Sequence, residues 1–141
     1  MGNHTLEIGN GDKYKGDVVN GKKHGKGRYY YANGNVYEGD YVDDEIHGKG
    51  RFTFKADGNK YEGDFEHGVM KGKGTFTTKD GNKYVGEFDN NTFNGQGKLT
   101  IKNGPVYEGE FKDGKKNGKG KQTNPDGSSQ EGTWKDDVFQ G

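Results

Sequence analysis

The chain has 141 residues, of which 25% are hydrophobic and 31% are charged, and its 22 basic residues balance its 22 acidic ones. This neutrality leaves no long-range field to attract nucleic acid, and the absence of cysteine excludes disulfides and thiolate metal sites. No apolar stretch approaches the ~18 residues of a membrane-spanning helix and residues 1–8 lack a signal-peptide core, so we expect neither membrane spanning nor secretion.

One frame recurs along the chain: Tyr-x-Gly-x-Phe or a variant of it, a six-residue gap, and Gly-x-Gly. Successive frames are about 23 residues apart, and a fixed period between ~20 and ~50 residues is typical of repeat arrays. We expect a single domain over residues 1–141; the alternative is a fragment cut inside a longer array. The domain comprises a half-unit at residues 2–13, units starting near Tyr14, Tyr37, Tyr61, Tyr84 and Tyr107, and a truncated unit at residues 130–141.

Each unit contains two segments in which inward and outward residues alternate, as in β-strands. Tyr61, Gly63 and Phe65 share one face of a first segment, and Asx-Gly pairs between units supply the positive φ angles that reversals need. The sequence therefore predicts an all-β fold: an elongated single-layer antiparallel meander of about twelve strands, formed by stacked β-hairpins. The Asx-Gly pairs lie at residues 10–11, 33–34, 57–58, 80–81, 103–104 and 126–127.

The two faces of the predicted sheet differ in chemistry. Glycine weakens a strand unless something covers it, so we expect Tyr and Phe rings to lie flat across glycines of neighbouring strands. Valine in place of Gly63 or Gly74 should then clash with a ring. On the opposite face, acidic first segments such as Glu38 and Asp40 alternate with basic second segments such as Lys26 and Arg28, which fixes register and solubility.

The sequence resembles the MORN repeat (membrane occupation and recognition nexus) over essentially its whole length. The resemblance is carried by Tyr-Glu-Gly-Asp-Phe at residues 61–65 and by His-Gly-Lys-Gly at residues 24–27 and 47–50. Similar arrays occur in membrane-junction proteins, phosphoinositide kinases, cytoskeletal scaffolds and methyltransferases, where they accompany another domain. The resemblance therefore implies an architecture rather than one activity.

The sequence offers few residues in an arrangement that could catalyse a reaction. Ser128 and Ser129 lie far in the sequence from any histidine, so a nucleophile with a base is not expected. His24 and His47 occupy one phase of the repeat, where Asn also occurs, which favours a hydrogen-bonding role over metal binding. We predict that the protein is not an enzyme and has no cofactor and no metal.

Three sets of residues are candidates for binding. The inner aromatic face would form a partner-binding groove, since Tyr and Phe are favoured interface anchors. A row of residues in the six-residue gaps would form a loop ridge that either staples each loop to its neighbour or binds a partner. Two basic clusters are either solvated or bind an anionic ligand. The groove comprises Tyr29, Tyr37, Phe54, Tyr61, Phe76, Tyr84 and Tyr107; the loop ridge is Ile46, Met70 and Phe93, flanked by lysines; the basic clusters include Lys22, Lys23, Lys26, Arg28, Lys115 and Lys116.

Two functions fit these features. The first is a protein-interaction scaffold that binds a helix or an extended segment of another protein in the aromatic groove. The second is an adaptor that binds an anionic phospholipid, such as a phosphoinositide, through the basic loops. The aromatic face runs the length of the chain whereas most lysines have acidic neighbours, so we favour the scaffold. We also expect a homodimer through unpaired strand edges, no nucleic-acid partner, and a cytoplasmic location at the periphery of the membrane or the cytoskeleton.

Overall fold

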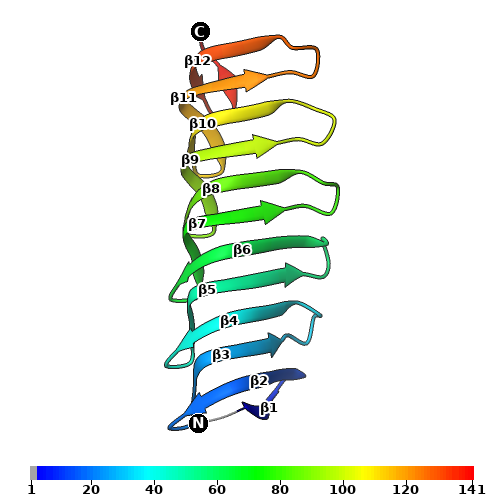
Figure 1. Cartoon of the computed structure of the whole chain (residues 1–141), viewed down its shortest axis with the longest axis vertical. Coiled ribbons are helices and arrows are strands. Elements are labelled where there is room, and N and C mark those ends of the chain that lie inside the picture. The colour runs from blue at the N-terminus through cyan, green and yellow to red at the C-terminus, as the bar shows by residue number, and fades with distance from the viewer. Residues whose placement is uncertain (1–2) are drawn as a thin grey trace. The chain divides into compact units, whose positions relative to one another are not determined.

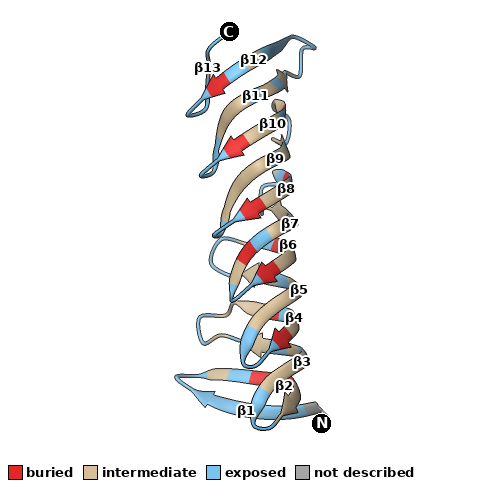
Figure 2. Ribbon diagram, turned by 90° about the vertical axis from the view of Figure 1, so that its left-hand side faces the viewer, coloured by how far each residue is buried: buried red, intermediate tan, exposed pale blue. Residues whose placement is uncertain are grey.

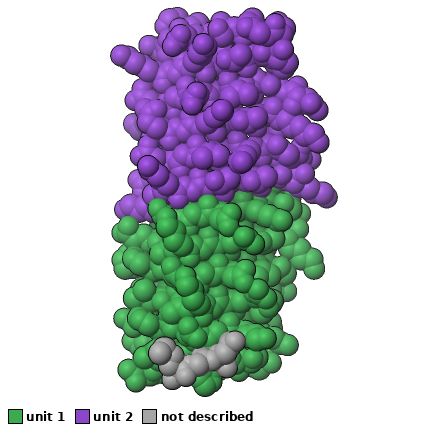
Figure 3. Space-filling model, viewed as in Figure 1, with its two compact units in different colours: residues 1–69 green, residues 70–141 purple. Residues whose placement is uncertain are grey.

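The computed structural model describes residues 3–141, which form strands and turns (Figure 1). Backbone contacts divide the chain into unit 1, Met1–Val69, and unit 2, Met70–Gly141 (Figure 3). Among the described residues there is no helix long and apolar enough to cross a membrane. Unit 1 contains β1 (Asn3–Gly9), β2 (Asp12–Val19), β3 (Lys22–Tyr30), β4 (Val36–Val42), β5 (Glu45–Phe54) and β6 (Asn59–Glu66). Unit 2 contains β7 (Val69–Thr77), β8 (Lys83–Asp89), β9 (Thr92–Thr100), β10 (Val106–Lys112), β11 (Lys115–Thr123), β12 (Ser129–Lys135) and β13 (Val138–Phe139); the first residue of β7, Val69, is counted with unit 1.

Within each unit, every strand pairs antiparallel with the strand that precedes or follows it in the sequence. Unit 1 runs from the β1–β2 pair to the β5–β6 pair, and unit 2 from the β7–β8 pair to the β12–β13 pair. The predicted all-β antiparallel meander is confirmed. The described strands exceed the predicted twelve because the truncated last unit still forms the short β13.

Two kinds of turn connect the strands. The longer turns, on the right in Figure 1, contain five of the six predicted Asx-Gly pairs, and each of the six pairs has a positive φ at one or both residues, as at Gly34 and Asn103. The sixth pair, Asn10–Gly11, forms a two-residue reversal between β1 and β2. The other turns are two-residue reversals with positive φ at both positions, such as Asn20–Gly21 and Asp43–Asp44, which is the type I′ geometry of tight hairpins.

These tight turns correct the predicted loops. The six-residue gap is mostly strand, because the hairpin needs only two residues to reverse. Ile46, Met70 and Phe93 therefore lie on β5, β7 and β9, and the row that they form is not a loop ridge. We refer to it below as the ridge row.

A shift of register bends the sheet in four of the hairpins. Between the pairs Gly16–Gly27 and Val18–Lys23, β2 contributes only Asp17 whereas β3 contributes residues 24–26. The longer strand must bulge, and Gly25 adopts a φ of +107° there, which residues with a side chain rarely adopt. The same shift recurs in the β4–β5, β8–β9 and β10–β11 pairs.

The bend makes one face of the sheet concave. Tyr37 and Tyr41 are four residues apart on β4, which on a straight strand is about 13 Å. Their ring centroids are only 5.4 Å apart, with one ring edge against the other face. We call the face that carries these rings the inner face and the opposite, charged face the outer face.

In each unit the largest fully buried side chains are tyrosines of the inner face, and the buried positions, red in Figure 2, lie on the strands. A Cβ atom at Gly97 would lie 2.4 Å from the Tyr84 ring, and the Tyr84 hydroxyl donates a hydrogen bond to the Glu87 carbonyl at 2.7 Å. The predicted covering of glycine by aromatic rings is therefore present, with tyrosine as the covering residue. These tyrosines, the core row, are Tyr14, Tyr37, Tyr61, Tyr84 and Tyr107.

The outer face carries the predicted rows of opposite charge. In unit 1, Lys26 pairs with Asp40, Arg28 with Glu38, and Arg51 with Glu62 at 3.0 Å. In unit 2 the register places Glu108 of β10 between Lys98 of β9 and Lys121 of β11. Such exposed pairs contribute only ~0.2–1 kcal/mol each, so their main effect is on register and solubility.

Candidate functional site

Four aromatic rings form a half-buried strip on the inner face of unit 1. Tyr29 and Tyr31 follow the second glycine of β3, and Phe52 and Phe54 occupy the same positions on β5. The ring centroids are 4.5 Å apart between Tyr29 and Tyr31, 5.5 Å between Tyr31 and Phe52, and 4.5 Å between Phe52 and Phe54. These four residues, the aromatic strip, contact one another ring to ring, and each is half-buried.

The structure separates the predicted groove residues into two groups. Tyr37, Tyr61, Tyr84 and Tyr107 are buried, because the bend folds the rest of the hairpin over them, so their side chains offer no surface to a partner. Tyr29, Phe54 and Phe76 are half-buried. A partner-binding role on the inner face remains a prediction that concerns this second group.

Sequence reasoning missed Tyr31 and Phe52 as members of the strip. Each lies two residues from a predicted member on the same strand or its extension, Tyr31 from Tyr29 and Phe52 from Phe54. The period-two alternation that places residues on one face was therefore sufficient to find them.

The inner face of unit 2 changes from apolar to polar along the chain. Phe76 of β7, Leu99 of β9 and Gln122 of β11 occupy positions equivalent to Phe52, opposite a tyrosine of the core row. Gln122 in turn donates a hydrogen bond to Asn124 at 3.3 Å. In unit 2 this position is therefore aromatic only at Phe76 among these three strands.

The ridge row packs on the core tyrosines and holds the next tight turn. Phe93 stacks on Tyr84 with a centroid distance of 3.8 Å and an interplanar angle of 4°, and Met70 is only 9% exposed. The Asn91 N–H donates to the Met70 carbonyl at 3.1 Å, and the Gly68 N–H donates to the Ile46 carbonyl at 2.8 Å. These contacts are the ones expected if the row attaches each turn to its neighbour, which was the first of the two interpretations of the row.

The lysines of the same row lie against aromatic rings. Lys23 Nζ is 5.7–5.8 Å from the ring centroids of Tyr14, Tyr29 and Tyr41, and 3.4 Å from Asp44. An ammonium above an aromatic face is attracted by the ring quadrupole. Lys23 is therefore part of the inner face and is not a solvated loop residue; its side chain is 17% exposed.

The remaining basic candidates are divided between the two units. In unit 1, Lys26 and Arg28 already pair with carboxylates, which leaves Lys22 exposed beside its turn. In unit 2, Lys115 is exposed at a turn, whereas Lys116 is half-buried on the inner face. Three of the six residues predicted as an anionic-ligand site, Lys23, Lys26 and Arg28, are thus paired with the chain's own acids.

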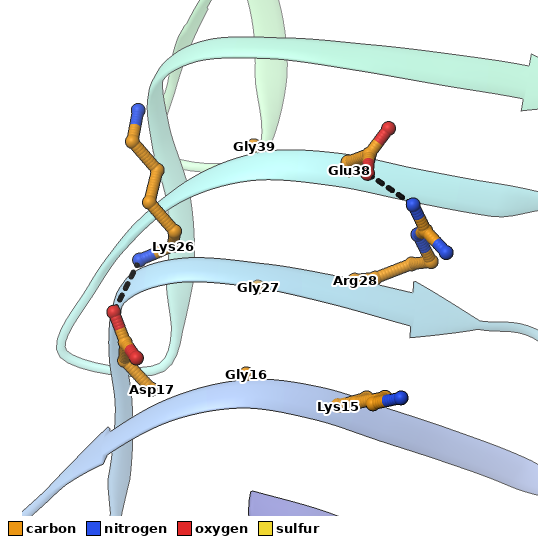
Figure 4. Close-up of a pocket in the computed structure, with 8 residues that line it drawn as sticks. All are labelled: Lys15, Gly16, Asp17, Lys26, Gly27, Arg28, Glu38 and Gly39. Carbon is orange, nitrogen blue, oxygen red and sulfur yellow. Dashed lines mark hydrogen bonds and ion pairs between the residues drawn. The ribbon is translucent and has the colours of Figure 1, made fainter. Parts of the chain in front are cut away.

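The outer face of unit 1 is hollowed over its glycines (Figure 4). A hollow of about 450 Å³ has Gly16, Gly27 and Gly39 as its floor and Lys15, Asp17, Lys26, Arg28 and Glu38 around it. The Lys26 N–H donates to Asp17 Oδ2 at 3.1 Å, and Arg28 pairs with Glu38 across the strands. Its walls carry both signs of charge and it is open to solvent, so it has no clear preference for a cation or an anion.

The two histidines accept hydrogen bonds from a neighbouring tight turn. The Asp43 N–H donates to His24 Nδ1 at 3.1 Å, and the His67 N–H donates to His47 Nδ1 at 3.2 Å. This confirms the predicted hydrogen-bonding role. Among residues 3–141, no group of three or more His, Asp or Glu side chains is arranged to hold a metal ion.

Comparison with known families agrees with this geometry. The MORN-repeat family model matches residues 14–36, 37–58, 61–83, 84–106, 107–129 and 131–141. The chain belongs to the MORN-repeat family. Five of its six repeats begin at the tyrosines that start the predicted units, and the last begins at Glu131, one residue after the predicted start of the truncated unit.

Individual proteins resemble this chain less strongly than the family model does. None of the curated proteins compared with this chain matches it. Among solved structures, the chain is similar to the SAS-4 TCP domain of Drosophila melanogaster, which was solved in complex with a proline-rich motif of Ana2. The sequences are 11% identical, the match covers 94% of this chain and 90% of that one, and the TM-score is 0.46.

The tyrosines of this MORN array have altered acidities. Burial raises the pKa of Tyr84 to about 12, with the neighbouring Glu87 adding to the shift. Burial and a hydrogen bond from the Tyr29 hydroxyl to Asp12, at 2.8 Å, raise the pKa of Tyr29 to about 12. Burial also raises the pKa of Tyr14, Tyr31, Tyr37, Tyr41, Tyr61 and Tyr107.

We expect the fold to be lost as the pH rises from about 10 towards 12. A tyrosine whose pKa is higher in the folded state contributes stability that is complete below the unfolded pKa of about 10 and disappears as the pH approaches the folded pKa. Tyrosinate absorbance and far-ultraviolet circular dichroism should therefore change together in one transition. Complete ionisation of the tyrosines near pH 10 with an unchanged dichroism spectrum would contradict this expectation.

Proposed function

We propose that the chain is a non-enzymatic protein-interaction scaffold whose inner face binds a segment of a partner protein. The observation that carries the proposal is the aromatic strip, Tyr29, Tyr31, Phe52 and Phe54, whose rings contact one another in sequence and are each half-buried. Rigid aromatic side chains lose little entropy on binding and dominate interface energetics. Membership of the MORN-repeat family is compatible with the proposal.

The strip indicates the chemistry of the partner segment. Its four rings contact one another, and Tyr29 and Phe52 lie opposite the buried Tyr37 on the strands that flank it, so the rings are held in place before binding, which lowers the cost of ordering the interface. The Tyr29 hydroxyl is already bonded to Asp12, which leaves mainly apolar ring surface on offer. We propose an extended or helical segment that presents apolar side chains to the strip.

The phospholipid adaptor is the alternative function. It relied on Lys22, Lys23, Lys26, Arg28, Lys115 and Lys116 acting as free cations. The contacts of Lys23 with Asp44, of Lys26 with Asp40 and of Arg28 with Glu38 favour the scaffold, because a cation that is already paired attracts an anionic headgroup weakly. A homodimer and a cytoplasmic location beside the membrane or the cytoskeleton are further proposals.

We expect the double substitution Phe52→Ser and Phe54→Ser to abolish partner binding. Peptides that bind the wild-type protein would first be selected from a random twelve-residue display library, and their dissociation constants would be measured by isothermal titration. Truncating an aromatic anchor at an interface costs about 2 kcal/mol or more, so we expect affinity to fall at least ~30-fold.

Matched changes on the other face of the same strand provide the control. The control variant carries Arg51→Ala and Thr53→Ala. On β5, Arg51 precedes Phe52 and Thr53 lies between Phe52 and Phe54, but both side chains point to the outer face. This variant should leave the affinity within about twofold. Selected peptides that bind the Phe52→Ser and Phe54→Ser variant normally but fail on the Arg51→Ala and Thr53→Ala variant would overturn the proposal and place the binding surface on the outer face.

A further inference from the structure

Lys116 lies on the inner face of unit 2 with part of its hydrogen-bonding capacity unused. Its Nζ atom is 4.9 Å from the centroid of the Trp134 ring and 5.5 Å from that of Tyr107. It donates one hydrogen bond, to Gln122 Oε1 at 2.6 Å. An ammonium group has three donors. The remaining donors of Lys116 are available to an acceptor that approaches the half-buried side chain.

Lys23 occupies the equivalent position in unit 1 and shows what Lys116 lacks. Lys23 Nζ also lies against aromatic rings, but Asp44 Oδ1 is 3.4 Å away and neutralises it. The counterpart of Asp44 in unit 2 is Asp137, and both carboxylates accept a hydrogen bond from the backbone N–H of their lysine, at 2.7 Å for Lys23 and 2.8 Å for Lys116. The two carboxylates therefore differ only in the side-chain ion pair that Asp44 forms with Lys23. Among the described residues, no carboxylate forms an ion pair with the Lys116 ammonium.

Lys116 carries a positive charge at a position of the ridge row that is apolar in the three preceding repeats. The ridge row carries Ile46, Met70 and Phe93 at the preceding positions; Met70 is buried and Phe93 stacks on Tyr84. A cation that replaces such a side chain is partly desolvated, which favours an anionic neighbour more strongly than at an open surface. A chain lying along the inner face of unit 2 would pass from the apolar Phe93 to the cationic Lys116.

We infer that Lys116 binds a carboxylate of the partner segment, so that the segment carries an acidic side chain beyond its apolar anchors. This inference rests on the proposed function, applied to the inner face of unit 2. Phe93 and Lys116 lie on β9 and β11, which are separated by β10. The two positions are therefore ~10 Å apart, or about three residues of extended chain. The acidic residue should follow or precede the residue that contacts Phe93 by about three positions.

A pair of synthetic peptides tests the inference. Both are acetylated and amidated chains of phenylalanines spaced by serines; one carries a single glutamate three residues from a phenylalanine, and the other carries glutamine there. Trp134 is the chain's single tryptophan and lies beside Lys116, so its fluorescence reports binding directly. We expect the wild-type protein to bind the glutamate peptide at least ~5-fold more tightly, with the preference shrinking at high salt.

Two methionine variants separate the charge from the packing. Lys116→Met keeps an unbranched chain over Trp134 and should reduce the preference for glutamate to about onefold. Lys23→Met removes the equivalent lysine, whose charge Asp44 already neutralises, and should leave the preference unchanged. Circular dichroism confirms that both variants are folded.

The outcomes that contradict the inference are distinct from those that contradict the proposed function. Equal affinity of the wild-type protein for the two peptides would overturn the role of Lys116 and leave the inner face as a binding surface. Loss of the preference in Lys23→Met, with Lys116→Met unaffected, would also overturn it. No binding of either peptide by the wild-type protein would overturn the inference together with peptide binding at this face.

Discussion

The substitution Gly97→Val should destabilise unit 2 by more than about 3 kcal/mol. A Cβ atom at Gly97 would lie 2.4 Å from Cε2 and from the hydroxyl oxygen of Tyr84, far closer than carbon atoms approach in proteins. The Tyr84 ring cannot retreat, because Phe93 stacks on its face and Phe88 and Phe111 meet its edges. Overpacking costs about 1–3 kcal/mol where a neighbour can shift, and expelling the ring costs more.

The measurement is thermal unfolding followed by circular dichroism. A loss of about 3 kcal/mol lowers the melting temperature of a domain of this size by roughly 10 °C or more. Lys98→Val is the matched control, since it introduces the same side chain one residue further along β9 on the outer face. It should shift the melting temperature by only a few degrees.

A double-mutant cycle identifies the cause. Combining Gly97→Val with Tyr84→Ala removes the ring that the valine would strike, so the two losses should sum to much less than their separate values. Strict additivity would show that the valine acts on something other than Tyr84. Equal melting temperatures for Gly97→Val and Lys98→Val would refute the clash itself.

The period of the sequence was sufficient to predict the meander and the pairing of glycine with aromatic rings. Tyr61, Gly63 and Phe65 repeat at a fixed phase, and a fixed phase places equivalent residues side by side when hairpins stack. The family assignment required nothing beyond these positions. It also follows that charged residues at Glu38 and Arg28 meet across strands, as observed.

The bend could not be derived from the period. It depends on β3 contributing three residues where β2 contributes one, and the alternation alone does not reveal that count. Without the bend, Tyr29 and Tyr37 look equivalent, since they are register partners on adjacent strands. With it, Tyr41 closes over Tyr37, whereas Tyr29 lies on the far side of Gly27 from the bulge and stays half-buried.

The same limit explains the ridge row and its lysines. The spacing of the repeat assigned the whole six-residue gap to a loop, although some of its tight turns, such as Asn20–Gly21, carry the Asn-Gly signal of a two-residue hairpin and others, such as Asp43–Asp44, do not. Once they are placed on strands, Lys23 and Lys116 point to the inner face and contact aromatic rings. The two lysines differ in whether a carboxylate pairs with the ammonium group, as Asp44 does with Lys23, and only the three-dimensional contacts reveal this.

Tyr37→Ala should cost unit 1 about 3–5 kcal/mol, the range for truncating a buried aromatic side chain. Tyr37 is fully buried, and its ring meets Tyr41 at 5.4 Å and Phe65 at 5.3 Å. The alanine variant would leave a cavity beneath these two rings and uncover Gly50, whose neighbour is the Tyr37 ring. Denaturant unfolding would measure the loss as a lower midpoint.

Two further variants show how the contribution of Tyr37 divides between ring and hydroxyl. Tyr37→Phe retains the ring but removes the hydroxyl that donates to the Asp40 carbonyl at 2.8 Å, so it should cost only about 1 kcal/mol. Tyr30→Ala truncates an exposed tyrosine of the same unit and should cost less than that. If Tyr37→Phe were as damaging as Tyr37→Ala, the hydrogen bond at the bend would be the main stabilising contact; we expect the ring to account for most of the loss, because the glycines beneath it have no side chains of their own to pack.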